Sequence, residues 1–447
     1  MNKESFVFCI GIISSILSIA CSNQVYADDL SSLFSKAKKF SPHLPLAYSQ
    51  QEIAKQKINQ AKAANEPKIN FSAQEKKGIS ARNGGEEIDY RLRNYAIQMS
   101  FPIINKSIQE EISSAEIAEK VALVQSQVTY DELLLTIVDQ YFKILNLDSK
   151  YQLMQQQKKL IYEQQRMAAA NFDQGMVSIT DLKEAEAKLA TLQSQEQSLY
   201  LEIAREKNIL SQFIGSNDFT IQQIQNSLAV LPILSISDQD FFSQLLLKNN
   251  KQIQISELNL EATKLELKQA KAARYPNLNF SAKLSRNFES QDSAFSNKQD
   301  GWDYLYGFEL NVPMYNSETH FKIKEKQASL DKSKNELNLA IQKQRRQMLE
   351  SFYTTLSSMS KANGMKEAES SLLVAWQSNK RAYEVGMRVN ADVLEAQSKY
   401  FEIKQERISM WYEAWQNYIK CKIILGTFTD EDLLNIDQIF YAKSLVN

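Results

Sequence analysis

The stretch Ala61-Lys-Ala-Ala-Asn-Glu-Pro-Lys-Ile-Asn-Phe-Ser-Ala-Gln74 recurs further along the chain as Ala270-Lys-Ala-Ala-Arg-Tyr-Pro-Asn-Leu-Asn-Phe-Ser-Ala-Lys283. Nine of the fourteen positions are identical, at an offset of 209 residues. A second pair of similar segments, 95–102 and 306–313, repeats at an offset of 211. The chain is therefore predicted to contain two copies of a unit of about 210 residues, and a function must use both copies.

The amino-acid composition favours long helices. Only 11 Gly and 7 Pro occur in 447 residues, so the residues that form turns are scarce. The 52 basic and 53 acidic residues nearly cancel, which suggests neither nucleic acid nor an anionic surface as a partner. The sequence holds no nucleophile motif, no phosphate-binding loop and no cluster of metal ligands. We therefore expect no enzyme activity, no cofactor and no bound metal.

The first 27 residues are predicted to be a secretory signal peptide. Lys3 precedes an apolar run at 6–20, and 25–27 carry small residues at the positions that signal peptidase reads. A membrane anchor is one alternative, but the run is short for a spanning helix. Lipoprotein processing at Cys21 is another, because Ser-Ile-Ala-Cys resembles a lipobox. Cleavage after Ala27 leaves only Cys421, so no internal disulfide is expected.

Four short segments alternate in hydrophobicity with the two-residue period of a β-strand. They are Ile69–Ala73, Tyr95–Phe101, Leu278–Leu284 and Tyr304–Val312. A polar loop separates the members of each pair, the first with Gly78 and 83–85 and the second at 289–298. Each copy is therefore predicted to contain a β-hairpin. Past the leader, no apolar run reaches the length of a transmembrane helix.

The alternation alone also fits a half-buried sheet of a soluble protein. Export, strands of about ten residues, and aromatic residues near the strand ends favour an outer-membrane barrel instead. These aromatic residues are Tyr90, Tyr95, Trp302 and Tyr304. Four strands cannot close a barrel, and open edges cannot face lipid because their N–H and C=O groups would lack partners. Several chains must then share one barrel, with two chains giving eight strands and three giving twelve.

Most of the remaining chain is predicted to be helical. The segments 107–172 and 317–385 contain no Pro and a single Gly, Gly364, so each is expected to form a helix of about 66 to 69 residues, roughly 100 Å long. Apolar residues recur at alternating spacings of three and four, apart from Asp131, which indicates coiled-coil packing. A turn with Gly ends each long helix, and a further helix is predicted at 180–213 and at 391–425.

The predicted organisation is a signal peptide at 1–27, a first repeat at 28–225, a linker at 226–240, a second repeat at 241–430 and a C-terminal tail at 431–447. Each repeat is expected to run as helix, β-hairpin, long helix and helix. This order places the hairpins at one end of the molecule and the turns between helices at the other.

Several segments resemble the TolC family of outer-membrane efflux and secretion channels. The most specific is Tyr383-Glu-Val-Gly-Met-Arg-Val-Asn-Ala-Asp-Val-Leu-Glu-Ala-Gln397, and Asn171-Phe-Asp-Gln-Gly-Met-Val-Ser-Ile-Thr-Asp-Leu182 is similar in the first copy. The likeness covers residues 28–439, nearly the whole mature chain. It implies a mainly helical fold with a small membrane β part. Three identical chains would form a twelve-stranded β-barrel, four strands per chain, joined to a long coiled-coil α-helical barrel.

The resemblance also implies a location and partners. The homotrimer would contact the lipid of the outer membrane of a Gram-negative bacterium and extend far into the periplasm. There it would dock on a periplasmic adaptor (membrane fusion) protein and on an inner-membrane transporter of the RND, MFS or ABC type. It would be the passive exit duct of a tripartite efflux pump or a type I secretion system, opened at its helical tip.

A periplasmic gate made by Tyr383, Arg388, Asp181 and Thr180 is implied by the same resemblance. Tyr383 and Arg388 would reach from one helix pair toward Asp181 and Thr180 on the other and hold the tip closed. An Arg–carboxylate pair with a phenol hydrogen bond is worth a few kcal/mol when partly shielded, so a docking partner can reverse it. The alternative interpretation is that these are ordinary capping and surface ion-pair residues near a turn.

Asp392 and Glu395 lie three residues apart on one predicted helix and share a face. The resemblance places them inside the tunnel entrance, where threefold symmetry would make a ring of six carboxylates that favours cations and binds multivalent ones. Two solvated acids on a helix face are the alternative. The adaptor is expected to contact the tip turns, which hold Gly175, Met176, Gly386 and Met387.

The alternative function is an exported periplasmic or surface coiled-coil scaffold or adhesin without a channel. Heptads, duplication and the lack of a catalytic motif fit a scaffold as well. A scaffold does not explain two hairpins at equivalent points of the helical pattern, so the channel is the preferred prediction. Drug efflux and protein secretion both fit such a channel.

Overall fold

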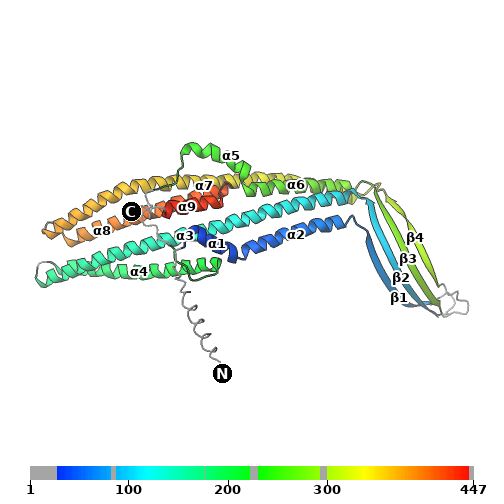
Figure 1. Ribbon diagram of the computed structural model, residues 1–447, viewed down its shortest axis with the longest axis horizontal. Helices are drawn as coiled ribbons and strands as arrows, with labels where there is room; N and C mark the ends of the chain where they lie inside the picture. Colours follow the sequence, from blue (N-terminus) through cyan, green and yellow to red (C-terminus); the bar gives the residue numbers. More distant parts are fainter. Residues whose placement is uncertain (1–27, 82–86, 176, 222–229, 292–299, 442–447) are drawn as a thin grey trace, which may run out of the picture.

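The computed structural model describes residues 28–81, 87–175, 177–221, 230–291 and 300–441. The molecule is elongated, with a β-sheet at one end and long helices that run from the sheet to the opposite end (Figure 1). The predicted signal peptide, with Cys21, and Met176 lie outside the described residues.

The two halves of the chain repeat the same order of elements. The first half contains α1 (Leu30–Phe40), α2 (His43–Ala63), β1 (Lys68–Ala81), β2 (Glu87–Ile104), α3 (Lys106–Asp173) and α4 (Ile179–Ile214). The second half contains the 3-10 helix η1 (Ile236–Asp238), α5 (Gln239–Asn249), α6 (Lys251–Ala272), β3 (Asn277–Gln291), β4 (Asp300–Asn311), α7 (Ser317–Glu384) and α8 (Asn390–Ile424). A last helix, α9 (Asp430–Tyr441), follows.

The four strands form one antiparallel sheet in the order β1-β2-β3-β4. The central pair, β2 and β3, joins the two halves, and β1 and β4 are the edges of the sheet. The strands are longer than the sequence pattern predicted. Gly78, placed in a loop by the sequence analysis, pairs with Tyr90 inside β1, and residues 289–291 belong to β3. These two loop assignments were wrong because pairing with a neighbouring strand outweighs the weak local preference of Gly and polar residues for turns.

In the part of the sheet nearer the helices, the register gives one apolar and one polar face, whereas toward the far end the face of Phe71 also carries Glu75, which pairs with Arg91 and Arg93. The apolar face includes a row of directly paired residues that crosses all four strands, namely Phe71, Ile97, Leu284 and Tyr304. The residue next to each of these points to the opposite face. These neighbours form a second paired row, namely Asn70, Gln98, Lys283 and Leu305. Successive side chains of a strand point to opposite faces, so the alternation seen in the sequence becomes two chemically different surfaces.

Both long helices begin with the same side-chain cap. The Asn105 Oδ1 accepts the backbone N–H of Ser107 at 3.0 Å at the start of α3. The Asn316 Oδ1 accepts the N–H of Glu318 at 2.8 Å at the start of α7. Each cap satisfies backbone donors that the first helical turn leaves free, and it fixes the point where a strand becomes a helix. The two helices are 68 residues each, about 100 Å at 1.5 Å per residue.

The helical part has its largest core about halfway along its length. Large aromatic side chains meet there from α3, α8 and α9, and they are Phe142, Trp411, Trp415 and Phe440. Toward the sheet, Asp131 of α3 fills the polar slot in the heptad pattern, and its Oδ2 lies 2.7 Å from the Lys251 Nζ of α6. Burial raises the pKa of Asp131, and the Lys251 ammonium opposes that shift. In the described part of the chain, no helix is both long and apolar enough to cross a membrane.

The C-terminal helix α9 also holds the start of α1. The Asp437 carboxylate accepts the backbone N–H of Leu30 at 3.2 Å and of Ser31 at 2.9 Å. Asp29 caps the same helix through the Ser32 N–H at 2.8 Å. Burial raises the pKa of Asp437 from 3.8 to about 6, the nearby Asp29 charge adds to the rise, and the two backbone hydrogen bonds oppose it.

Asp437 is expected to make stability depend on pH. Because its pKa is higher in the folded chain than in the unfolded one, the folded state binds the proton more tightly, and this stabilisation is lost as the pH rises from about 4 to about 6. Asp437→Asn removes the titration. Thermal unfolding followed by circular dichroism should show that the melting temperature of the variant increases relative to that of the wild type as the pH rises over this range. The same change of melting temperature with pH in the two proteins would contradict the assignment.

Candidate functional site

The helical end opposite the sheet is built from two matched turns (Figure 1). Gly175 follows α3 with φ 73°, and Gly386 follows α7 with φ 76°. Their N–H groups donate to the main-chain oxygens of Phe172 at 2.8 Å and Tyr383 at 2.9 Å. Glycine adopts this left-handed conformation without strain, so the two repeats reverse direction by the same device. Met387 beside the second turn is 81% exposed.

The two turns differ in how the next helix starts. Ser178 and Asp181 form a capping box at the start of α4, with the Ser178 Oγ accepting the Thr180 N–H at 2.9 Å and the Asp181 Oδ2 accepting the Ser178 N–H at 3.2 Å. The start of α8 has Val389 at the N-cap and no side-chain cap. The start of α4 therefore has a local side-chain cap that the start of α8 lacks.

Asn390 joins the two turns and was not singled out by the sequence analysis. It is 1% exposed, and its side-chain Nδ2 donates to the main-chain oxygen of Asp181 at 3.3 Å. An Asn in the first turn of a helix ordinarily signals only a local cap. Its real partner lies 209 residues away, which no local pattern reveals.

A cavity of about 570 Å³ lies between the two helix hairpins at this end. Three of the four predicted gate residues, Tyr383, Arg388 and Asp181, line it together with Asn390. Thr180 is exposed and is not part of the lining. Burial raises the pKa of Tyr383, the Asp181 charge adds to the rise, and a hydrogen bond with Asn171 opposes it. The phenol thus lies within the field of the Asp181 carboxylate.

Asp392 and Glu395, the two acids predicted at the tunnel entrance, each form an ion pair with a basic residue four positions away in the chain. The Arg388 Nη1 lies 3.2 Å from the Asp392 Oδ2. The Lys399 Nζ lies 2.6 Å from the Glu395 Oε1. In the single chain, Arg388 is therefore bonded to Asp392, with Asp181 nearby across the cavity. Neither pairing was predicted from the sequence.

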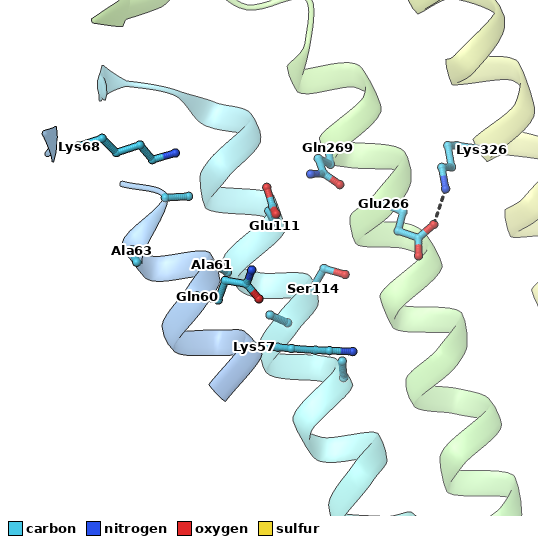
Figure 2. A pocket seen from close by; sticks show the side chains of 13 residues that line it. Lys57, Gln60, Ala61, Ala63, Lys68, Glu111, Ser114, Glu266, Gln269 and Lys326 are labelled. Atoms are coloured by element: carbon cyan, nitrogen blue, oxygen red, sulfur yellow. Dashed lines mark hydrogen bonds and ion pairs between the residues drawn. The ribbon is translucent and has the colours of Figure 1, made fainter. Parts of the chain in front are cut away.

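A second cavity, of about 740 Å³, lies near the sheet between α2, α3 and α6. Figure 2 shows that Lys57, Lys68 and Glu111 extend separately along its rim, while Glu266 and Lys326 face each other. The Lys326 Nζ lies 2.7 Å from the Glu266 Oε2. Charges of both signs are interspersed here, and the described residues contain no group of three or more His, Cys, Asp or Glu that would hold a metal. The tip cavity is the better candidate site.

Comparison with known proteins gives concordant matches over most of the chain. The sequence model of the family described as "Outer membrane efflux protein" matches residues 33–216 and 242–427. The outer membrane protein TolC of Escherichia coli K12 is 23% identical over 427 residues, covering 92% of this chain and 85% of the relative. The proteases secretion protein PrtF of Dickeya chrysanthemi is 20% identical over 323 residues, covering 71% and 69%.

Solved structures agree with the fold. The crystal structure of CusC, a protein that forms a transmembrane channel, superposes with a TM-score of 0.76 at 17% sequence identity, covering 90% of this chain and 94% of that one. At such low identity the superposition supports the fold alone.

Proposed function

Because the chain belongs to the outer membrane efflux protein family, we propose that three copies form the exit duct of a tripartite efflux pump or a type I secretion system. The protein is an outer-membrane efflux or secretion channel and not an enzyme. The proposal concerns the number of chains in the channel, the partners of the channel and the way in which it opens. The family match also favours the channel over the coiled-coil scaffold.

The sheet is the observation that carries the proposal of a shared barrel, and the resemblance to the TolC family sets the number of chains at three. Its edges β1 and β4 present unpaired N–H and C=O groups, which must find strand partners before the sheet enters lipid. Pairing β4 of one chain with β1 of the next closes a barrel, and three chains supply twelve strands. The row with Phe71, Ile97, Leu284 and Tyr304 then faces lipid, and the row with Lys283 faces the interior.

The helices extend this barrel into a tunnel. With α3 and α7 at 68 residues each, the tunnel reaches about 100 Å from the sheet, far enough to meet partners across much of the periplasm. A periplasmic adaptor engages the turns at Gly175 and Gly386, and an inner-membrane transporter supplies the energy. The channel consumes nothing. The family is described by efflux and its relatives include a protein named for protease secretion, so both small molecules and secreted proteins are candidate cargo.

The gate at the tip holds the resting tunnel closed. Tyr383, Asp181 and Arg388 line one cavity between the two helix hairpins, and Asn390 already links α8 to the main chain at Asp181. In the trimer, the Arg388 guanidinium is proposed to bond to Asp181 or Thr180 of an adjacent hairpin, either in place of Asp392 or in addition to it. Docking of the adaptor separates the hairpins, breaks these contacts and widens the entrance.

The direct test is reconstitution of the outer-membrane trimer in planar lipid bilayers. The proposal predicts stable single channels whose conductance rises when the tip contacts are removed. A purified particle that inserts into bilayers yet conducts no ions even when the tip contacts are removed would refute the duct.

The acidic pair is expected to bind trivalent cations at the entrance. Asp392→Ala together with Glu395→Ala removes six carboxylates from the proposed trimer, and block of the channel by hexamminecobalt(III) should be lost because multivalent cations bind rings of acids. The measurement is the half-blocking concentration in bilayers. Persistent block in the double variant would place the cation site elsewhere.

A further inference from the structure

The charged face of α8 continues beyond the two predicted acids. Asp392 and Glu395 are followed on the same face by Lys399, Glu402 and Glu406. The spacings of three, four, three and four residues keep all five side chains in one stripe along the helix. Residues between them, among them Val393, Leu394 and Gln397, are buried. The stripe therefore faces away from the packed core of the chain.

Lys399 is the one cation within this stripe of four carboxylates. Its Nζ lies 2.6 Å from the Glu395 Oε1, and the two side chains are 58% and 65% exposed. The hydrogen bond with Glu395 and its negative charge raise the pKa of Lys399, so the ammonium keeps its charge at neutral pH. The order of charges along the stripe is two negative, one positive and two negative.

The other cations nearby on α8 are committed elsewhere. The Lys404 Nζ donates to the Tyr400 hydroxyl at 3.4 Å, and Tyr400 is buried. The Arg407 Nε lies 2.5 Å from the Glu369 Oε2 of α7. Neither side chain joins the stripe, and Arg388, which pairs with Asp392 at 3.2 Å, lies at its end. Lys399 alone therefore separates the two acidic parts of the stripe.

We propose that Lys399 sets the ion preference of the tunnel entrance. This inference rests on the proposed function, in which Asp392 and Glu395 face the tunnel. Lys399 shares their face, so the trimer carries three ammonium groups just inside the acidic ring. They divide what would be one continuous acidic column into two shorter ones, weaken the binding of multivalent cations, and reduce the barrier to anionic solutes.

The distances make this effect large enough to measure. At 1.5 Å per residue, Lys399 lies about 6 Å along the helix from Glu395 and about 4.5 Å from Glu402. Both separations are shorter than the screening length of about 8 Å at physiological salt. The ammonium therefore acts on the acids of both sides whether or not its exposed ion pair with Glu395 is formed at a given moment.

The test compares Lys399→Gln with the wild-type trimer in planar bilayers. The half-blocking concentration of hexamminecobalt(III) should be about five- to tenfold lower in the variant. The reason is that the variant trimer lacks three ammonium groups whose screened charge repels the cation. The reversal potential in a KCl gradient should move toward that of a potassium-selective pore. Lys399→Glu should produce a larger shift in the same direction. Because Lys399 is exposed, neither change should disturb folding, which the yield of trimer verifies.

Lys183→Gln is the matched control. Lys183 is exposed on α4 near the same end and pairs with Glu186 at 2.7 Å, so it resembles Lys399 in type, exposure and partner but lies off the stripe. Block and selectivity should match the wild type.

Equal half-blocking concentrations for wild type and Lys399→Gln, or an equal shift with Lys183→Gln, would overturn the inference while leaving the channel intact. A wild-type trimer that forms no channel would overturn the proposed function, and this inference with it.

Discussion

The double substitution Tyr383→Phe and Arg388→Ser is expected to raise the single-channel conductance of the trimer several-fold. Both side chains line the tip cavity with Asp181, and Tyr383 lies in the field of that carboxylate. Removing the phenol hydroxyl takes away a hydrogen bond with Asn171 worth about 0.5–1.5 kcal/mol, and removing the guanidinium takes away the charged contact proposed with Asp181 or Thr180, worth about 1.5–3 kcal/mol. Losses repeated in three chains are enough to shift a two-state gate from mostly closed to mostly open.

The control for the gate is Tyr162→Phe with Arg381→Ser. Tyr162 is an exposed phenol of α3, and Arg381 is an exposed guanidinium in the last turn of α7. The control double variant loses the same two groups from outside the cavity, so its conductance should equal that of the wild type. If the gate variant also conducts like the wild type, these residues are surface capping and ion-pair groups, and the tip is closed by other contacts.

Ile97→Arg is expected to abolish the outer-membrane trimer. Ile97 lies on the apolar row of β2 between Phe71 of β1 and Leu284 of β3. An Arg facing lipid costs about 2–4 kcal/mol at the bilayer midplane, and the proposed trimer bears that cost three times. Outer-membrane fractionation with quantitative blotting should show the variant degraded or retained in the periplasm.

Gln98→Arg is the matched control for the membrane face. Gln98 is the next residue of the same strand and lies on the polar row beside Lys283. There the added charge faces the water-filled interior, so trimer yield should stay near that of the wild type. Equal yields from Ile97→Arg and Gln98→Arg would mean that the apolar row does not face lipid.

The repeat, the strands and the long helices were predictable because each has a strong periodic signal. The alternation in 304–312 predicted β4, and the lack of breakers in 317–385 predicted α7, which the structure places at 317–384. The end of β1 was not predictable. Gly78 carries a local turn signal, yet in the structure it pairs with Tyr90, and that pairing is a property of the sheet.

Helix α9 was missed for a related reason. It is 12 residues long, too short to be stable by itself, and its segment was predicted only as a C-terminal tail at 431–447. Phe440 packs on Trp411 and Trp415, and Asp437 bonds to the start of α1. These partners come from distant parts of the chain, so a local pattern could not predict the helix.

At the tip, the residues were predictable but their partners were only partly so. The resemblance selected Tyr383, Arg388 and Asp181, which the structure brings to one cavity. It did not reveal that Arg388 bonds to Asp392 or that Glu395 bonds to Lys399. Ion pairs four residues apart on a helix are common and individually weak, so sequence spacing alone gives them no special weight. The structure shows that both ion pairs lie along one face of the helix.

The most direct test of the channel is the mass of the particle extracted from purified outer membranes in detergent, measured beside the mass of the denatured chain. Three chains per particle are predicted, because the open edges of a four-stranded sheet require several chains in one barrel and the resemblance to the TolC family implies three. A soluble periplasmic monomer or dimer would contradict the account, because the open edges of β1 and β4 would then have no place in a membrane.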